Sequence, residues 1–342
     1  MATAATADER LRQQSLTQRL ISRPELGALI GAIAVFIIFS ILAGGRGFLT
    51  QEGAATYLVV AAEIGILGAA VALLMIAGEF DLSIGSMVGA AGMVAALAMS
   101  VYGLPAWLAV VLAFAFALGI GALNGYLVVR TRLPSFIVTL GTLFILRGVT
   151  IGVTRLITGR TQVGGLGAFI ETDPIAPLFT AEVGGLKVQI LWWIVLTGVA
   201  TFVLLRTSFG NWIYGVGGNE AAARNVGVPV TRVKIVLFMG TAAAGALLGL
   251  IQVFQSESAD VLRGENKELE GIITAVVGGT LLTGGYVTAL GTFLGALTLG
   301  MAKQGIFFTG ISGDWYLATL GALLLGAVLF NNFVRRRASE AR

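Results

Sequence analysis

Four ionisable side chains lie within long apolar runs of this 342-residue sequence: Glu63, Glu79, Asp81 and Arg147. Charged groups are costly at membrane depth, so such residues are functional candidates unless they pair with one another. The sequence contains no cysteine and no histidine, which excludes disulfides, Cys/His metal sites, Ser-His-Asp triads and cysteine nucleophiles. We therefore predict no catalytic residue and no metal site.

Two of these carboxylates lie in the segment GEFDLSIG, residues 78–85, whose glycines predict a break between two helices. A break at membrane depth leaves backbone groups unpaired unless protein or a watery cavity satisfies them. Carboxylate and hydroxyl oxygens there could bind solute hydroxyls or shape a gate. Alternatively, the segment is a capped turn in which Asp81 caps the next helix and Ser83 lies in its first turn.

Further polar residues complete the set that we predict for a translocation path or gate. Asn124 could instead bond only a neighbouring helix, and Gln304, beside Lys303 near a helix end, could merely snorkel. Glu63 has no cation near it in sequence and needs an interior partner. The predicted path or gate residues are Glu63, Glu79, Asp81, Ser83, Asn124, Thr139, Thr142, Thr283 and Gln304.

The elements that must position these residues are membrane helices. The composition is 56% hydrophobic and 12% charged, and a hydrocarbon core of about 30 Å needs about 20 apolar residues per helix. Its many glycines lie inside apolar runs, where small residues let helices approach closely. We predict an all-α polytopic membrane protein with ten spans, near 26–44, 54–77, 82–100, 105–129, 135–156, 189–205, 234–254, 271–286, 288–308 and 314–334.

The basic residues between the runs predict the orientation. With a cytoplasmic tail at 1–25, ten spans at 26–334 return a second tail, 335–342, to the cytoplasm. Lys and Arg then concentrate on the inside segments, as the positive-inside rule requires. A loop at 157–188 lies outside, and a loop at 206–233 lies inside.

Two pairs of similar segments indicate an internal repeat. GEFDLSIG (78–85) resembles GGTLLTGG (278–285), and residues 139–143 resemble residues 319–323. These pairs predict that helices 2–5 and 7–10 are repeats. Because they are five helices apart, the two halves would be inverted, with the substrate path at their interface.

The inside loop contains a predicted helix at residues 219–226, ended by Gly227 and Pro229. One interpretation is a solvated amphipathic turn. The other is a docking helix whose alanines fit a partner's groove while Glu220 and Arg224, four residues apart, fix the register. The predicted coupling residues are Asn219, Glu220, Ala222, Ala223, Arg224 and Gly227.

Together these motifs resemble the permeases of bacterial ABC importers for ribose, xylose, fructose and related monosaccharides. The likeness covers residues 54–334 and rests on residues 78–85, on Leu133–Leu143 and on residues 278–285. The family's Ala-Ala-Arg-x-x-Gly coupling motif is similar to residues 222–227. Two departures are Ala221 where an acid is usual and Glu79-Phe80 within the first motif, which leave the docking contact and the substrate subgroup open.

The resemblance implies a permease subunit in the bacterial inner membrane that carries a monosaccharide or polyol by alternating access. Implied partners are ATP-binding subunits, a sugar-binding protein outside, a second permease copy in a homo- or heterodimer, and lipid, but no nucleic acid. No cofactor is expected in this chain, and ATP and Mg belong to the partner. No lysine follows a glycine, so a Walker A loop is excluded. The alternative is an ion-coupled secondary transporter of a small polar solute.

Overall fold

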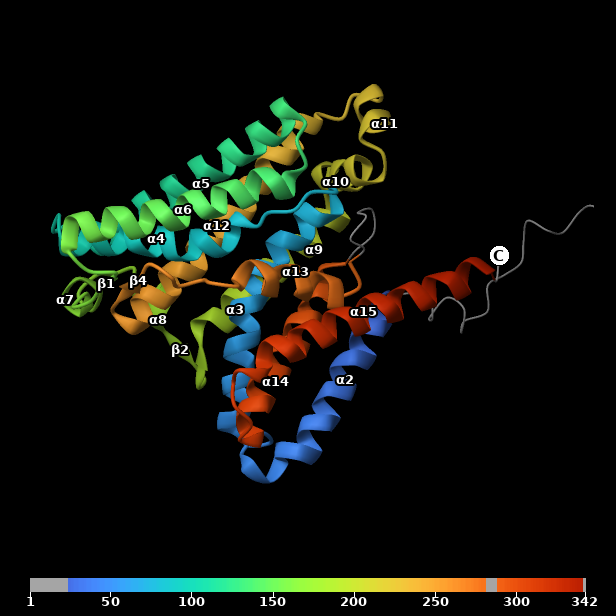
Figure 1. The fold of residues 1–342 in the computed structure, drawn as a ribbon, viewed down its shortest axis with the longest axis horizontal. Coiled ribbons are helices and arrows are strands. Elements are labelled where there is room, and N and C mark those ends of the chain that lie inside the picture. The colour runs from blue at the N-terminus through green and yellow to red at the C-terminus, as the bar shows by residue number, and fades with distance from the viewer. Residues whose placement is uncertain (1–23, 281–287, 341–342) are drawn as a thin grey trace, which may run out of the picture.

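The computed structural model describes residues 24–280 and 288–340, and this part of the chain is almost entirely helical (Figure 1). The long helices are α2 (Pro24–Ala43), α3 (Gln51–Ile76), α4 (Ser83–Ser100), α5 (Ala106–Thr131), α6 (Ser135–Thr158), α9 (Val188–Arg206), α12 (Val230–Ser256), α14 (Ala289–Thr309) and α15 (Trp315–Glu340). Shorter elements are η2 (Gly44–Arg46), α7 (Gly167–Ile170), α8 (Pro177–Thr180), α10 (Ser208–Gly218), α11 (Glu220–Asn225) and α13 (Lys267–Val277).

Within the described residues, 7 helices are long and apolar enough to cross a membrane. This confirms an all-α polytopic membrane protein, whereas the count of ten spans stays a prediction. Lys303 and Gln304 interrupt the apolar run of α14, and among the described side chains of α15 the apolar run is Trp315–Leu329. Where the eighth span was predicted, α13 has 11 residues, too few to cross a hydrocarbon core; part of that span, 281–286, lies outside the described residues.

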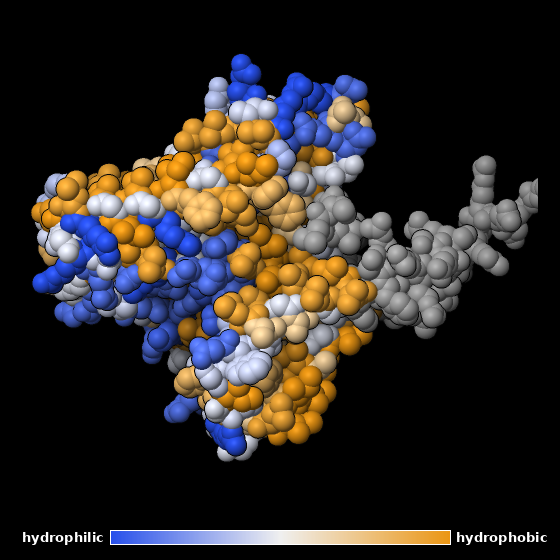
Figure 2. All heavy atoms as spheres, in the orientation of Figure 1, coloured by the Kyte–Doolittle hydropathy of each residue, from blue (hydrophilic) through white to orange (hydrophobic). Residues whose placement is uncertain are grey.

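Helices α3, α4 and α12 form the centre of the molecule. In α4, 89% of the apolar window is buried, compared with 22% in α2 and in α6. Helix α12 packs along α4 and α5, and α14 packs along α2 and α3. Apolar side chains cover much of the outer surface (Figure 2), as expected where lipid replaces water.

Small residues explain the close contact between α5 and α12. One face of α5 carries Ala109, Ala113, Ala117, Gly121 and Gly125, all buried. A Cβ atom at Gly121 would lie 2.6 Å from the Phe238 carbonyl oxygen of α12, so only glycine permits this approach. The prediction that glycines form helix-packing surfaces is confirmed at this contact.

The two segments predicted to be repeats begin with the same turn. Helix α3 is followed by Gly78 with φ +82°, and α13 is followed by Gly279 with φ +97°. The amide of Glu79 donates to Leu74 O, and that of Thr280 donates to Ala275 O. These are equivalent helix-ending bonds, displaced by one residue from the predicted pairing of Gly78 with Gly278. The inverted repeat itself stays a prediction.

The two long loops differ from each other in structure. The predicted outer loop contains α7, α8 and a hairpin of β2 (Glu182–Val183) with β3 (Leu186–Lys187). In addition, β1 (Gln162–Val163) pairs with β4 (Ala259–Asp260), which ties this loop to the segment after α12. The predicted inside loop contains α10, which was not predicted, and α11. The predicted C-terminal tail largely continues α15, which ends at Glu340.

Candidate functional site

The break between α3 and α4 is held by a buried hydrogen-bond network around Asp81. This side chain has 0% exposure, and its Oδ1 accepts from Ser83 N at 2.9 Å and from Ser83 Oγ at 2.6 Å. Its Oδ2 accepts from Thr241 Oγ1 of α12 at 2.5 Å. The Asp81 side chain thus closes the turn before α4, and one of its partners lies on another helix. The N-cap of α4 is Leu82, without a side-chain cap, rather than Asp81 as the capped-turn interpretation had it.

Helices α5 and α6 extend this network. Thr142 Oγ1 donates to Asn124 Oδ1 at 2.7 Å, and Asn124 Nδ2 donates to Ser83 Oγ at 3.0 Å. The backbone of the break is satisfied from α6, because Leu82 N donates to Thr139 Oγ1 and Phe80 N donates to the hydroxyl of Ser135. Five of the predicted path residues thus lie together, and their contacts fix the shape of the break.

Glu79, in the same break, is part of a chain of charges that leads to α11. Lys234 Nζ of α12 lies 2.5 Å from Glu79 Oε1 and 2.7 Å from Glu220 Oε2. Glu220 also binds Arg224 at 2.9 Å. The hydrogen bond from Lys234, together with the Arg224 charge, lowers the pKa of Glu220 below its ordinary value. The break and α11 are therefore connected by one buried ammonium group.

Helix α11 has the boundaries expected from its sequence. The Asn219 side chain accepts from Ala222 N at 2.9 Å, and Gly227 ends the helix in the left-handed conformation with φ +87°. Ala222 and Arg224 are exposed, whereas Ala223 is buried against Gly215 of α10. The small side chain of Ala223 thus packs within the chain, and Ala222 is on the outer surface; the docking role of these residues stays a prediction.

A second group of charges surrounds the start of α13. Lys267 Nζ lies 3.3 Å from Glu63 Oε2 of α3 and 3.0 Å from Glu270 Oε2. Lys303 of α14 lies 2.8 Å from Glu270 Oε1 and 4.6 Å from the centroid of the Tyr316 ring. Glu63 therefore has its interior partner, and Lys303 pairs inside the protein rather than only snorkelling.

Arg147, the cation within α6, lies close to two carboxylates. Its guanidinium nitrogens are 3.9 Å from Glu265 Oε1 and 4.0 Å from Glu268 Oε1. Both separations exceed hydrogen-bond length. Glu268 lies in the first turn of α13 and is buried.

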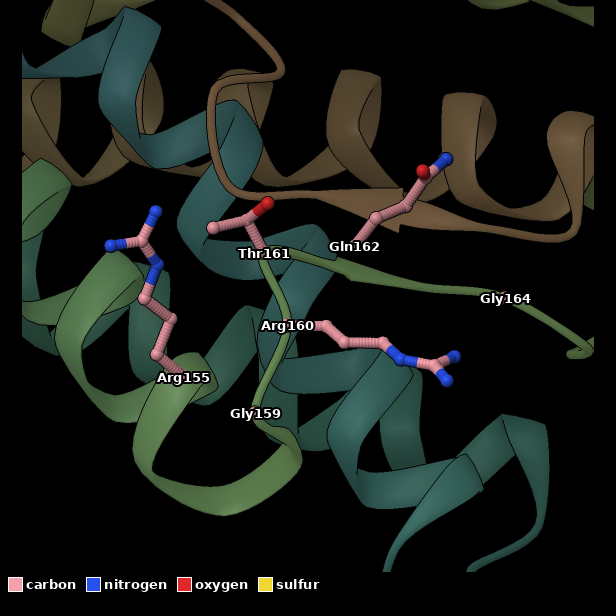
Figure 3. Close-up of a pocket in the computed structure, with 6 residues that line it drawn as sticks. All are labelled: Arg155, Gly159, Arg160, Thr161, Gln162 and Gly164. Atoms are coloured by element: carbon pink, nitrogen blue, oxygen red, sulfur yellow. The ribbon is translucent and has the colours of Figure 1, made fainter.

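Of the remaining predicted path residues, Gln304 does not join these groups. Gln304 is half-buried in α14 beside Lys303, and Thr283 lies outside the described residues. A separate open hollow of about 730 Å³ lies at the C-terminal end of α6 (Figure 3). It is lined by Arg155, Gly159, Arg160, Thr161, Gln162 and Gly164, and its two arginine side chains point in different directions (Figure 3).

Sequence reasoning missed the partners Ser135, Lys234, Thr241, Glu268 and Glu270. Lys234 was counted only as a loop cation, although the periodicity of α12 could have placed it one turn inside the helix. Glu268 and Glu270 precede the predicted eighth span and were not recognised as buried charges.

A buried helical core with lipid-compatible outer faces, a polar helix break and an exposed capped helix together define a multi-pass membrane transport protein. Residues 53–328 match the family described as branched-chain amino acid transport system / permease component. The match covers more than half of the chain, so the protein belongs to this family of transport permeases. It is a transport component rather than an enzyme.

Curated relatives include sugar permeases. The chain is 34% identical to the ribose import permease protein RbsC of Escherichia coli (strain K12), over 78% of this chain and 81% of that protein. It is 29% identical to the xylose transport system permease protein XylH of the same strain, over 91% of this chain and 92% of that protein. It is 32% identical to RbsC of Bacillus subtilis (strain 168), over 90% and 92%. No solved structure matches the chain.

Proposed function

We propose that this protein is the membrane-spanning subunit of an ABC importer that carries a simple sugar, a monosaccharide or related polyol, across the bacterial inner membrane. The observation that carries this proposal is the similarity to ribose and xylose permeases over most of the chain and most of each relative. Hydrolysis of ATP, with its Mg, then takes place in separate cytoplasmic subunits. A sugar-binding protein delivers the solute from outside.

The family description names branched-chain amino acids, which makes an amino acid the second candidate solute. Sugar is favoured because the named relatives import ribose or transport xylose. The similarity covers 78% of this chain for the ribose permease and 91% for the xylose permease. A sugar is neutral and an amino acid is a zwitterion, so one binding site is not expected to carry both. A transport assay with each labelled solute therefore separates the two candidates.

For the coupling of ATP hydrolysis to transport, we propose α11 as the docking helix. Its exposed surface includes Ala222, Arg224 and Val226, and Val226 is 80% exposed, which suits a groove in a partner protein. Movement of α11 would reach the α3–α4 break through Glu220, Lys234 and Glu79. This link supports alternating access, in which partner closure changes the packing around the break.

The ion-coupled alternative requires carboxylates that are free to bind an ion. Glu63 and Glu79 each face a lysine, at 3.3 Å and 2.5 Å, and Asp81 accepts hydrogen bonds from Ser83 and Thr241. These contacts favour structural and coupling roles. The arrangement of ten spans, an inverted repeat, both termini inside and a permease dimer completes the proposal.

Uptake by the reconstituted transporter tests the function. The permease, its ATP-binding subunit and its binding protein in proteoliposomes should accumulate labelled ribose or xylose with ATP present, and an uncoupler should not stop this. Accumulation of leucine in place of either sugar would identify the amino-acid candidate. Uptake driven by a proton or sodium gradient without ATP would support the secondary transporter instead.

A further inference from the structure

Helix α13 places a carboxylate at membrane depth whose second oxygen has no hydrogen-bond partner in the described part of the chain. Its first residue, Lys267, contacts Glu63 in the middle of α3, so α13 begins inside the membrane region. The next residue, Glu268, is 7% exposed, and its Oε2 has no hydrogen-bond partner among the described residues. A buried carboxylate oxygen without a donor is costly, and such a group usually has a functional reason.

The Oε2 atom of Glu268 packs closely against the α4 backbone at Gly85. A Cβ atom at Gly85 would lie 1.8 Å from Glu268 Oε2. Gly85 belongs to the 78–85 segment, so a glycine in this segment has a local reason besides the helix break. The contact places Glu268 between α4 and α6, next to the network around Asp81 and Ser83.

Arg147 provides a complementary donor beside this acceptor. Its Nη2 lies 4.0 Å from Glu268 Oε1 and is buried with no hydrogen-bond partner in the described part of the chain. The other ion pairs have N–O distances between 2.5 and 3.3 Å. The Arg147 pairs are therefore the loose ones, and a separation of this size suits an oxygen that bridges both groups.

This pair adjoins hydrophilic surface. In Figure 2, hydrophilic atoms fill a hollow beside the start of α13, between the apolar surfaces of α5–α6 and α14–α15. Glu265, whose side chain is 53% exposed, connects Arg147 to solvent. Arg147 Nη2 and Glu268 Oε2 are themselves buried, and the exposed Glu265 side chain lies between the pair and this hydrophilic surface.

The chemistry of the pair selects among solutes. Arginine only donates hydrogen bonds and a carboxylate only accepts them, whereas a hydroxyl does both. Two neighbouring hydroxyls can thus satisfy Arg147 and Glu268 together. An anionic group would meet the carboxylates of Glu265 and Glu268, and an ammonium group would meet the guanidinium of Arg147.

We infer that Arg147 and Glu268 form a contact site for neighbouring hydroxyl groups of the transported sugar, at the junction of α4, α6 and α13. This inference rests on the proposed function and adds where the solute is recognised inside the permease. Glu265 attracts the solute to the site from the polar hollow. The closely paired Glu270 and Lys303 support α13 without touching the sugar.

A chemical double-mutant cycle tests the site. ATP-dependent uptake of labelled ribose, and of ribose analogues lacking one hydroxyl each, is measured for wild type, Glu268→Gln, Arg147→Gln and Glu270→Gln in proteoliposomes. Dividing each variant rate by the wild-type rate for the same sugar cancels the preference of the binding protein. Loss of a hydrogen bond to a charged group should lower ribose uptake by Glu268→Gln at least about tenfold.

The deoxy analogues distinguish contact from structure. Glu268→Gln and Arg147→Gln each lower uptake relative to wild type. For the analogue that lacks the contacted hydroxyl, this fold reduction should be at least about fivefold smaller than for ribose. The matched comparison is Glu270→Gln, because both carboxylate oxygens of Glu270 face lysines. This variant should lower the uptake of every sugar by the same factor. Equal penalties for all analogues in Glu268→Gln and Arg147→Gln would overturn the site, while wild-type sugar uptake would still support the importer.

Discussion

Replacing Lys234 with methionine tests the connection between α11 and the helix break. The ammonium group lies 2.5 Å from Glu79 and 2.7 Å from Glu220, and methionine keeps most of the side-chain length without the charge. The two carboxylates differ in environment, since the side chain of Glu79 is 11% exposed and that of Glu220 is 43% exposed. The two lost interactions therefore contribute unequally.

The expected magnitude follows from these exposures. Removing one partner of a buried ion pair costs about 3 to 5 kcal/mol, because an uncompensated charge stays buried. A pair with an exposed carboxylate contributes only about 0 to 1 kcal/mol. Lys234→Met should thus lower the free energy of unfolding by about 3 to 5 kcal/mol, nearly all of it through Glu79. The double variant Lys234→Met, Glu79→Gln should recover most of this loss.

Two assays report the effect. Unfolding of the purified transporter in detergent gives the stability change, and sugar carried per ATP hydrolysed gives the coupling, which should fall in Lys234→Met. The control is Arg232→Met, an exposed residue on the same helix, which should change stability by no more than about 0.5 kcal/mol. If Lys234→Met lowers the free energy of unfolding as much in the Glu79→Gln background as in wild type, the proposed coupling of these two charges is refuted.

Three further predictions address orientation, docking and pH. In this cysteine-free chain, an impermeant thiol reagent outside intact cells should label a cysteine introduced at Glu182 but not one at Ser339; the reverse pattern would contradict the topology. Ala222→Trp, at an exposed position, should weaken co-purification of the ATP-binding subunit with little effect on folding, whereas Ala223→Trp should overpack α10 at a cost of about 1 to 3 kcal/mol. If both variants bind the ATP-binding subunit as well as wild type does, α11 is excluded as the docking helix. Because the pKa of Glu220 is lowered, its contribution should be complete above its ordinary value of 4.5 and be lost as pH falls through its lower folded pKa. The protection of the α11 amides against hydrogen exchange, relative to the intrinsic rate at each pH, should fall in that range. In Glu220→Gln the protection should not change over the same range.

Local patterns in the sequence were sufficient for several features. The apolar runs predicted helices because their length matches the bilayer, and the structure has helices at each described run. Asn219 and Gly227 predicted the limits of α11 because capping and left-handed glycine depend on neighbouring residues alone. The same reasoning placed a break after Gly78, where φ is +82°.

The partners of the buried charges were decided by tertiary structure. Glu63 and Lys267 are 204 residues apart, and Asp81 and Thr241 are 160 residues apart. No periodicity within one helix can specify such a pair, because it depends on which helix faces pack together. Ala222 and Ala223 are the same residue type, and only the packing of α11 on α10 leaves the first exposed and buries the second. The sequence alone determined which side chains needed partners at membrane depth, and the packing of α3, α4, α6, α12 and α13 decided which partners they have.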